Sequence, residues 1–108
     1  MTESKSDGGG DRSPQPLTGV EMIARERARQ VRVEDWTPAH DDGHTRGELA
    51  RAAACYALQH TRVSGRAIRW PWSKAWWKPR DPISNLVRAG ALIAAEIDRL
   101  QRKANGKS

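Results

Sequence analysis

Residues 70–79 read WPWSKAWWKP and restrict the fold more than any other stretch of the chain. They hold four of the five tryptophans in a 108-residue sequence that has no phenylalanine. Pro71 and Pro79 block a continuous helix, and adjacent Trp76 and Trp77 cannot place both rings on one helical face. We therefore expect an ordered connector in which some rings cover the core and others are exposed or face a partner.

The first helix is expected to begin at Thr18, because Thr18 and Glu21 have the spacing of a capping box. It should run to about Glu34. Its apolar stripe is thin, which predicts burial on one side only. The stripe consists of Val20, Ile23, Ala24, Ala28 and Val31.

The second helix is expected to open at Thr45, which has the same Thr-x-x-Glu spacing to Glu48, and to end near Thr61. It is rich in alanine, so a neighbouring helix could approach its backbone closely. Its expected inner face consists of Leu49, Ala52, Ala53, Tyr56 and Ala57.

The third helix is expected to open at Asp81, a good N-cap residue followed by Pro82 at the first helical position. It should extend to about Lys103 and form the centre of the core. Gly90 should allow close packing against the alanines of the second helix. The expected core stripe is Ile83, Leu86, Val87, Gly90, Ile93, Ala94, Ile97 and Leu100, widened by Ala91, Leu92 and Ala95.

Together these elements predict a mainly α-helical domain of two to three packed helices with a long ordered Trp-rich connector. Residues 17–103 form this single domain, and residues 1–16 and 104–108 are expected to be disordered tails because they lack large apolar groups. Val63 and residues 67–70 could add a short β-hairpin arm. A folded part this small often gains burial by forming oligomers, so we expect a homo-oligomer.

The charge distribution indicates an anionic partner. The net charge is +6, and no acidic residue lies between Glu48 and Asp81. In a segment whose charged residues are all basic, the cations can pair with phosphate groups, and the tryptophan rings can stack on bases. A solvated basic loop remains the alternative. The basic residues of this interval are Arg51, Arg62, Arg66, Arg69, Lys74, Lys78 and Arg80.

A second polar cluster precedes the second helix, with two histidines and two aspartates in residues 40–44. These groups could ligate a metal, but their spacing matches no strong zinc signature, so we expect no metal and no cofactor. Capping and hydrogen bonding to a ligand are favoured instead. The complete expected ligand-binding set is Trp36, His40, Asp42, His44, Arg66, Arg69, Trp70, Trp72, Lys74, Trp76, Trp77, Lys78 and Arg80.

The sequence favours a binding protein over an enzyme. There is no Gly-rich phosphate loop or nucleophile elbow, and magnesium-binding carboxylates are sparse: Glu48 on the second helix, Glu96 and Asp98 on the third. With one cysteine, no leader and no long apolar run, we expect a soluble cytoplasmic protein without a membrane partner.

Several ordered blocks carry a family resemblance: Trp36 with His40-Asp41-Asp42 and His44-Thr45, Gly47-Glu48-Leu49-Ala50, Trp70-Pro71-Trp72, and Trp76-Trp77-Lys78-Pro79. Over roughly residues 20–100 the chain resembles a family of small proteins encoded by tailed phages and prophages. That resemblance implies an accessory phage gene, a group that includes oligomeric inhibitors of bacterial immunity that sequester cyclic nucleotide signals. The third helix is also loosely similar to all-α nucleotide pyrophosphohydrolases of the MazG kind.

The resulting hypothesis is sequestration of an anionic nucleotide-type ligand, without cleavage, to counter a bacterial defence. The alternatives are an inhibitor that binds a host protein through a tryptophan hot spot and a metal-dependent nucleotide pyrophosphohydrolase. Nonspecific binding to single-stranded nucleic acid is less favoured.

Overall fold

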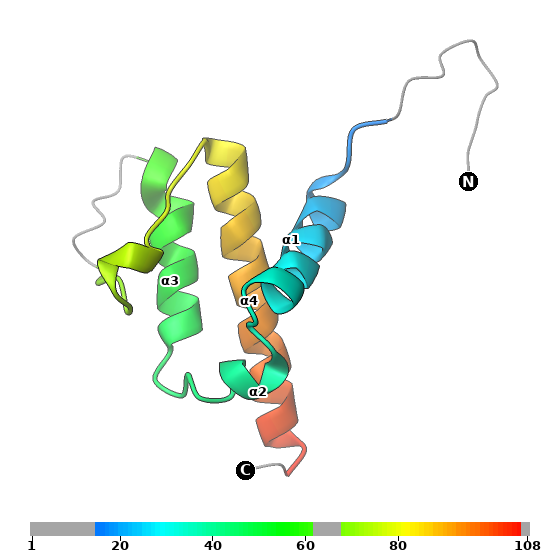
Figure 1. Ribbon diagram of the computed structural model, residues 1–108, viewed down its shortest axis with the longest axis vertical. Coiled ribbons are helices and arrows are strands. Elements are labelled where there is room, and N and C mark those ends of the chain that lie inside the picture. The colour runs from blue at the N-terminus through cyan, green and yellow to red at the C-terminus, as the bar shows by residue number, and fades with distance from the viewer. Residues whose placement is uncertain (1–14, 62–67, 107–108) are drawn as a thin grey trace, which may run out of the picture.

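The computed structural model describes residues 15–61 and 68–106. In chain order the elements are α1 (Gly19–Val33), α2 (Pro38–Asp41), α3 (Glu48–Ala57), the 3-10 turns η2 (Leu58–His60) and η4 (Lys74–Trp76), and α4 (Pro82–Ala104). α4 lies between α3 on one side and α1 on the other (Figure 1), and it contacts both. The described part is mainly helical and has no strand, which confirms the expected fold class.

α1 begins as predicted but buries a different face. The Thr18 N–H donates to the Glu21 carboxylate (2.8 Å), and the Glu21 N–H donates to the Thr18 hydroxyl oxygen (3.2 Å), which completes the capping box. Val20, however, is 78% exposed, and the buried residue is Gln30. The N-terminal end of α1 diverges from α4 (Figure 1), which leaves Val20 exposed, whereas Ile23 of the expected stripe lies against α4 at Gly90.

α3 starts two residues later than predicted, with its N-cap at Gly47 rather than Thr45. Gly47 is in the left-handed conformation with φ 79°, and no side chain caps the helix. The Glu48 carboxylate instead accepts a hydrogen bond from the Arg46 N–H (2.6 Å). The turn at Gly47 therefore separates Thr45 from the helix that it was expected to cap. The inner face is as predicted, with Leu49, Ala52, Ala53 and Tyr56 buried and Ala57 packed against them.

α4 begins as predicted, with the Asp81 carboxylate accepting the Ser84 N–H (3.1 Å). Its main expected stripe is wrong, but Ala91, Leu92 and Ala95, which were expected to widen it, are buried. The helix is apolar around most of its circumference, so helical spacing alone could not identify the buried side. The side that the neighbouring helices cover carries mostly small apolar residues and one large one, Leu92, whereas most of the other large aliphatic side chains are exposed. The buried set is Asn85, Ala89, Ala91, Leu92, Ala95 and Arg99, whereas Ile83, Leu86, Ile93, Ile97 and Leu100 are 44–61% exposed.

Gly90 does allow a close helix approach, but to α1 rather than to the alanines of α3. A Cβ atom at this position would lie 2.5 Å from Cδ1 and 2.8 Å from Cγ1 of Ile23. A glycine therefore stands where α1 crosses α4.

The core between α3 and α4 is small and rich in alanine, and indole rings surround it. Its buried members are Leu49, Ala52, Ala53, Tyr56, Ala89, Leu92 and Ala95, and Trp36, Trp70, Trp72 and Trp77 pack against them. This cover is the first role expected of the tryptophans. Residues 68–70 form no strand, and the other residues proposed for a hairpin, Val63 and Ala67, lie outside the described part.

Among the described helices, none combines the length and the apolar character needed to cross a bilayer.

Candidate aromatic binding pocket

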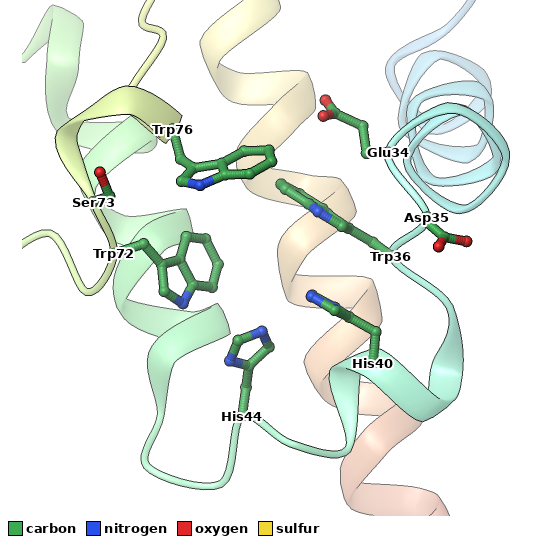
Figure 2. Close-up of a pocket in the computed structure, with 8 residues that line it drawn as sticks. All are labelled: Glu34, Asp35, Trp36, His40, His44, Trp72, Ser73 and Trp76. Atoms are coloured by element: carbon green, nitrogen blue, oxygen red, sulfur yellow. The ribbon is translucent and has the colours of Figure 1, made fainter.

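Two separate segments of the chain enclose a pocket of about 500 Å³, which we call the aromatic pocket. The segment from the end of α1 to the start of α3 forms one side, and the Trp-rich connector forms the other (Figure 2). Three indoles and two imidazoles dominate the wall. The lining residues are Glu34, Asp35, Trp36, His40, His44, Trp72, Ser73 and Trp76.

A tight turn at the end of α1 directs Trp36 into the pocket. The N–H groups of Glu34 and Trp36 both donate to the Gln30 carbonyl oxygen, at 3.1 and 3.0 Å. Asp35 between them has φ 61°, a left-handed conformation that aspartate tolerates better than most residues. The chain reverses here, and Trp36 then packs against the core.

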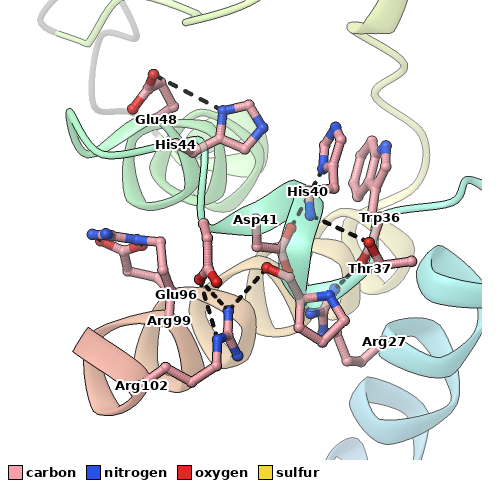
Figure 3. Close-up of polar contacts among 12 residues, drawn as sticks. Arg27, Trp36, Thr37, His40, Asp41, His44, Glu48, Glu96, Arg99 and Arg102 are labelled. Atoms are coloured by element: carbon pink, nitrogen blue, oxygen red, sulfur yellow. Dashed lines mark hydrogen bonds and ion pairs between the residues drawn. The ribbon is translucent and has the colours of Figure 1, made fainter. Parts of the chain in front are cut away.

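α2 is a short helix that the sequence did not predict, and salt bridges from both sides hold it in place (Figure 3). The Arg27 guanidinium of α1 donates to the fully buried Asp41 carboxylate and to the Trp36 carbonyl oxygen (3.2 Å). From α4, Arg102 donates to the Asp42 carboxylate (2.7 Å). These contacts fix the backbone that carries the pocket histidines.

The hydroxyl group of Tyr56 fixes the opposite wall. It donates to the Trp76 carbonyl oxygen (3.4 Å) and accepts hydrogen bonds from the Lys78 N–H (3.2 Å) and the Arg88 guanidinium (3.3 Å). The connector is thus tied to α3 on both sides of Trp77. This attachment holds η4, and with it Trp76, over the pocket.

The rings of the aromatic pocket form a continuous set of contacts. Trp36 and His40 are parallel to within 2°, with centroids 6.4 Å apart. Trp36 lies 6.0 Å from Trp72 and 6.3 Å from Trp76, at tilts of about 50°. His44 lies 5.1 Å from Trp72. The wall therefore offers several π faces in different orientations to a flat ligand.

The other two tryptophans form an inner cluster. Trp77 lies 4.8 Å from the Tyr56 ring and 4.7 Å from Trp70, and Trp70 meets Trp72 edge-on at 5.4 Å. Trp70 and Trp77 face a separate cavity of about 210 Å³, together with Lys74. The tryptophans therefore divide into rings that cover the core and a ring, Trp76, that is 47% exposed.

A carboxylate lies close to each pocket histidine. His40 Nδ1 is 3.6 Å from the Asp41 carboxylate, and His44 Nδ1 is 3.9 Å from that of Glu48. Burial, and then the neighbouring His40, lower the pKa of His44 below its usual value, although Glu48 opposes the shift. The His44 ring is therefore neutral at pH 7 and can donate one hydrogen bond and accept another.

One donor in the wall has no partner among the described residues. The Trp72 indole N–H is buried without a hydrogen bond. An unpaired buried N–H costs free energy, and such groups in native proteins call for an explanation such as water or a ligand. A small shift of this ring would offer the donor to a ligand in the pocket.

The predicted site residues are not all in one place. Trp36, His40, His44, Trp72 and Trp76 line the aromatic pocket, whereas Trp70, Lys74 and Trp77 line the smaller cavity. Lys78 places its ammonium 5.9 Å from the Trp76 ring centroid. Asp42 is bound to Arg102, and Arg69 is exposed. Arg80 lines a groove between α1 and α4, and Arg66 lies outside the described residues.

The charge of the pocket differs from the expected one. Of the described residues that line it, none is a lysine or an arginine, and two are the acidic residues Glu34 and Asp35. Arginines gather instead in the α1–α4 groove, which Arg25, Arg29, Arg32, Arg80 and Arg88 line. Sequence reasoning missed Glu34, Asp35 and Ser73, although each lies within two residues of a tryptophan that was selected.

Groups of three or more potential metal ligands do not occur in the described ranges 15–61 and 68–106. Comparison with protein-family models, curated proteins and solved structures finds no match for this chain.

Proposed function

We propose that this chain binds a nucleotide-type ligand through its base, which stacks in the aromatic pocket, and holds that ligand without cleaving it. The observation that carries the proposal is the convergence of five aromatic rings from two chain segments on a pocket of about 500 Å³. Base–aromatic stacking is a general way of holding nucleotides and contributes about 1–3 kcal/mol per base.

The acidic residues of the wall narrow the class of base. A carboxylate accepts hydrogen bonds and cannot donate them when ionised. Adenine, guanine and cytosine carry exocyclic amino donors, whereas the one Watson–Crick-edge donor of uracil, N3–H, lies between two carbonyl oxygens that a carboxylate repels, so Glu34 and Asp35 favour the amino-bearing bases. Glu34 is already bound to Arg29 (2.8 Å), so the exposed Asp35 is the better candidate acceptor.

The phosphate groups of such a ligand would lie outside the pocket, where the cations are. Lys78 sits beside the outermost ring, Trp76, and its charged group is exposed to solvent. In this arrangement the base lies beside the carboxylates of Glu34 and Asp35. The anionic phosphate lies away from those carboxylates, near Lys78, on a chain whose net charge is +6.

The biological setting of this proposal rests on the resemblance to phage-encoded accessory proteins. In that setting the ligand is a nucleotide signal of a bacterial defence, and the chain lowers its free concentration in the host cytoplasm. Tight binding alone would suffice for such a role.

The test is a calorimetric binding panel with AMP, GMP, CMP, UMP, ADP-ribose and cyclic dinucleotides, followed by chromatography of each bound ligand. We expect amino-bearing bases to bind more tightly than UMP, and every bound ligand to be recovered intact. Trp76→Ala should weaken binding about tenfold to a hundredfold through the loss of stacking. Trp76→Phe, which keeps a flat ring, should restore most of it.

Asp35→Asn tests the acidic wall separately, and should reduce the preference for amino-bearing bases over UMP. A ligand that is consumed would favour the hydrolase alternative. An absence of binding across the panel, together with a stable complex with one host protein, would favour the tryptophan hot spot. Unchanged affinity in the folded Trp76→Ala variant would contradict the proposed site.

A further inference from the structure

The face of α4 that α1 and α3 leave uncovered carries a row of large aliphatic side chains, which we call the outer stripe. Its members are Ile83 (61% exposed), Leu86 (44%), Ile93 (48%), Ile97 (51%) and Leu100 (48%). The buried residues of α4, among them Leu92 and Ala95, lie on the opposite side of the helix.

The spacing of the outer stripe is that of a coiled-coil seam. With Gly90 included, the intervals between successive members are three, four, three, four and three residues, the a and d positions of a heptad. Ile23 of α1 lies against Gly90, so the apolar surface continues where the stripe has no side chain. None of these positions is charged.

The outer stripe is large enough for a partner to cover it. Five aliphatic side chains at roughly half exposure form an apolar patch on the order of 400 Å², within the range of the largest patch on a typical monomer, which is often a functional surface. The parts of the given sequence outside the described residues cannot supply that cover, because residues 1–14, 62–67 and 107–108 contain only Met1 and Val63 as large apolar side chains.

We propose that the outer stripe of α4 packs against the same stripe of a second copy of this chain, in an antiparallel pair. The series of intervals reads the same in both directions, which is the self-complementarity that a two-fold interface requires. In the antiparallel register, each a position meets a d position of the partner copy. Ile83 then faces Leu100, Leu86 faces Ile97, and Ile93 faces Gly90 together with the Ile23 side chain that covers it.

Charge favours this orientation over a parallel one. The helix begins at Asp81 and ends with exposed Lys103. A parallel pair would bring two Lys103 side chains and two like helix-dipole ends together. An antiparallel pair keeps the two Lys103 side chains apart and opposes the two helix dipoles.

The size of the surface sets the expected strength. Two stripes with their flanking small residues would bury roughly 1,000 Å² in total, the lower limit for a specific interface. The pair should therefore dissociate on dilution. None of the stripe residues lines the aromatic pocket, so the assembly can be tested independently of any ligand.

The first test is sedimentation equilibrium of the full chain over a range of concentrations. The weight-average mass should rise from the monomer value of 12.1 kDa toward twice that value. Ile93→Glu, in the middle of the stripe, should remain a monomer throughout with its helical circular dichroism unchanged. Ile97→Lys should do the same, and serves if Ile93→Glu fails to fold.

Val33→Glu is the matched control, because Val33 is also an exposed aliphatic residue (63%, against 48% for Ile93) and belongs to α1 rather than to the stripe. It should dimerise like the unmodified chain. A chain that stays monomeric at high concentration would overturn the proposal, and so would a folded Ile93→Glu variant that still dimerises.

Orientation has its own experiment. Chains carrying Ile83→Cys are mixed with chains carrying Leu100→Cys and then oxidised. The antiparallel pair gives disulfides between the two kinds of chain, whereas a parallel pair joins like chains to one another. Predominance of like pairs would overturn the antiparallel arrangement.

Discussion

At the scale of single residues, protonation of the pocket residue His44 should make the free energy of unfolding depend on pH. Its pKa is lowered in the fold from the usual value of 6.5, chiefly by burial, so the unfolded chain binds this proton more tightly. The free energy of unfolding should therefore fall as the pH drops below about 6.5 and level off below the folded pKa. Each unit of difference between the pKa values of His44 in the folded and unfolded chain lowers the free energy of unfolding at acidic pH by about 1.4 kcal/mol.

Urea denaturation between pH 7.5 and 5 measures this dependence. His44→Gln should flatten it. The carboxyl groups of Glu26 and Glu48, whose pKa values are lowered from 4.5, act only at lower pH. An equally steep dependence in His44→Gln would show that another group is responsible.

At the scale of secondary-structure elements, the crossing of α1 over α4 depends on the absence of a side chain at Gly90. Alanine there would gain about 1 kcal/mol in helix propensity. Its Cβ would, however, lie within 2.8 Å of two Ile23 carbon atoms, and overpacking of this kind costs about 1–3 kcal/mol. Gly90→Ala should therefore lower the free energy of unfolding in the unmodified chain.

The same substitution made in an Ile23→Ala background should become stabilising, because the two carbon atoms in conflict are gone and the propensity gain remains. Chemical denaturation of the unmodified chain, the two single variants and the double variant completes this double-mutant cycle and gives the coupling free energy between the two positions. Stabilisation by Gly90→Ala in both backgrounds would argue against the close crossing.

At the scale of the whole molecule, the Arg27–Asp41 salt bridge attaches α2, and so one wall of the pocket, to α1. Asp41 is fully buried, and removal of one partner leaves a largely buried charge without its counterion. Asp41→Ala should therefore cost about 3–5 kcal/mol. Asp42→Ala breaks the exposed pair with Arg102 and should cost about 1 kcal/mol or less.

Thermal and urea unfolding of these two variants measure the difference. The Arg27→Met, Asp41→Leu double variant should recover much of the loss, because neither charge then remains buried. Equal destabilisation by Asp41→Ala and Asp42→Ala would mean that burial does not set the strength of the attachment.

Local signals in the sequence predicted the helices well. The capping box at Thr18 and the Asp81-Pro82 start both depend on contacts within a few residues, and both are present. The start of α3 was wrong because the left-handed turn at Gly47 overrode the Thr45 pattern. The main stripe expected on α4 was wrong because the helix is apolar around most of its circumference, so residue spacing alone did not show which side the neighbouring helices cover.

The candidate site was only partly visible in the sequence. Tryptophan density identified the connector, and residues 40–44 identified the histidines. The division of the tryptophans between two cavities depends on the hydrogen bonds by which Tyr56 attaches the connector to α3. These contacts join residues twenty or more positions apart. The acidic wall was missed because the search for an anion site gave weight to cations. Glu34 and Asp35 lie in the turn that ends α1, and no local pattern indicated that this turn faces Trp72.

The close contacts among the indoles also affect how this protein interacts with light. Neighbouring ring centroids lie 4.7–6.3 Å apart, near enough for their electronic transitions to couple. Coupled indoles add bands of either sign to the far-ultraviolet circular dichroism spectrum, on top of the helical signal. Helix content calculated from that spectrum will therefore be in error, and the same bands will change when any one ring moves.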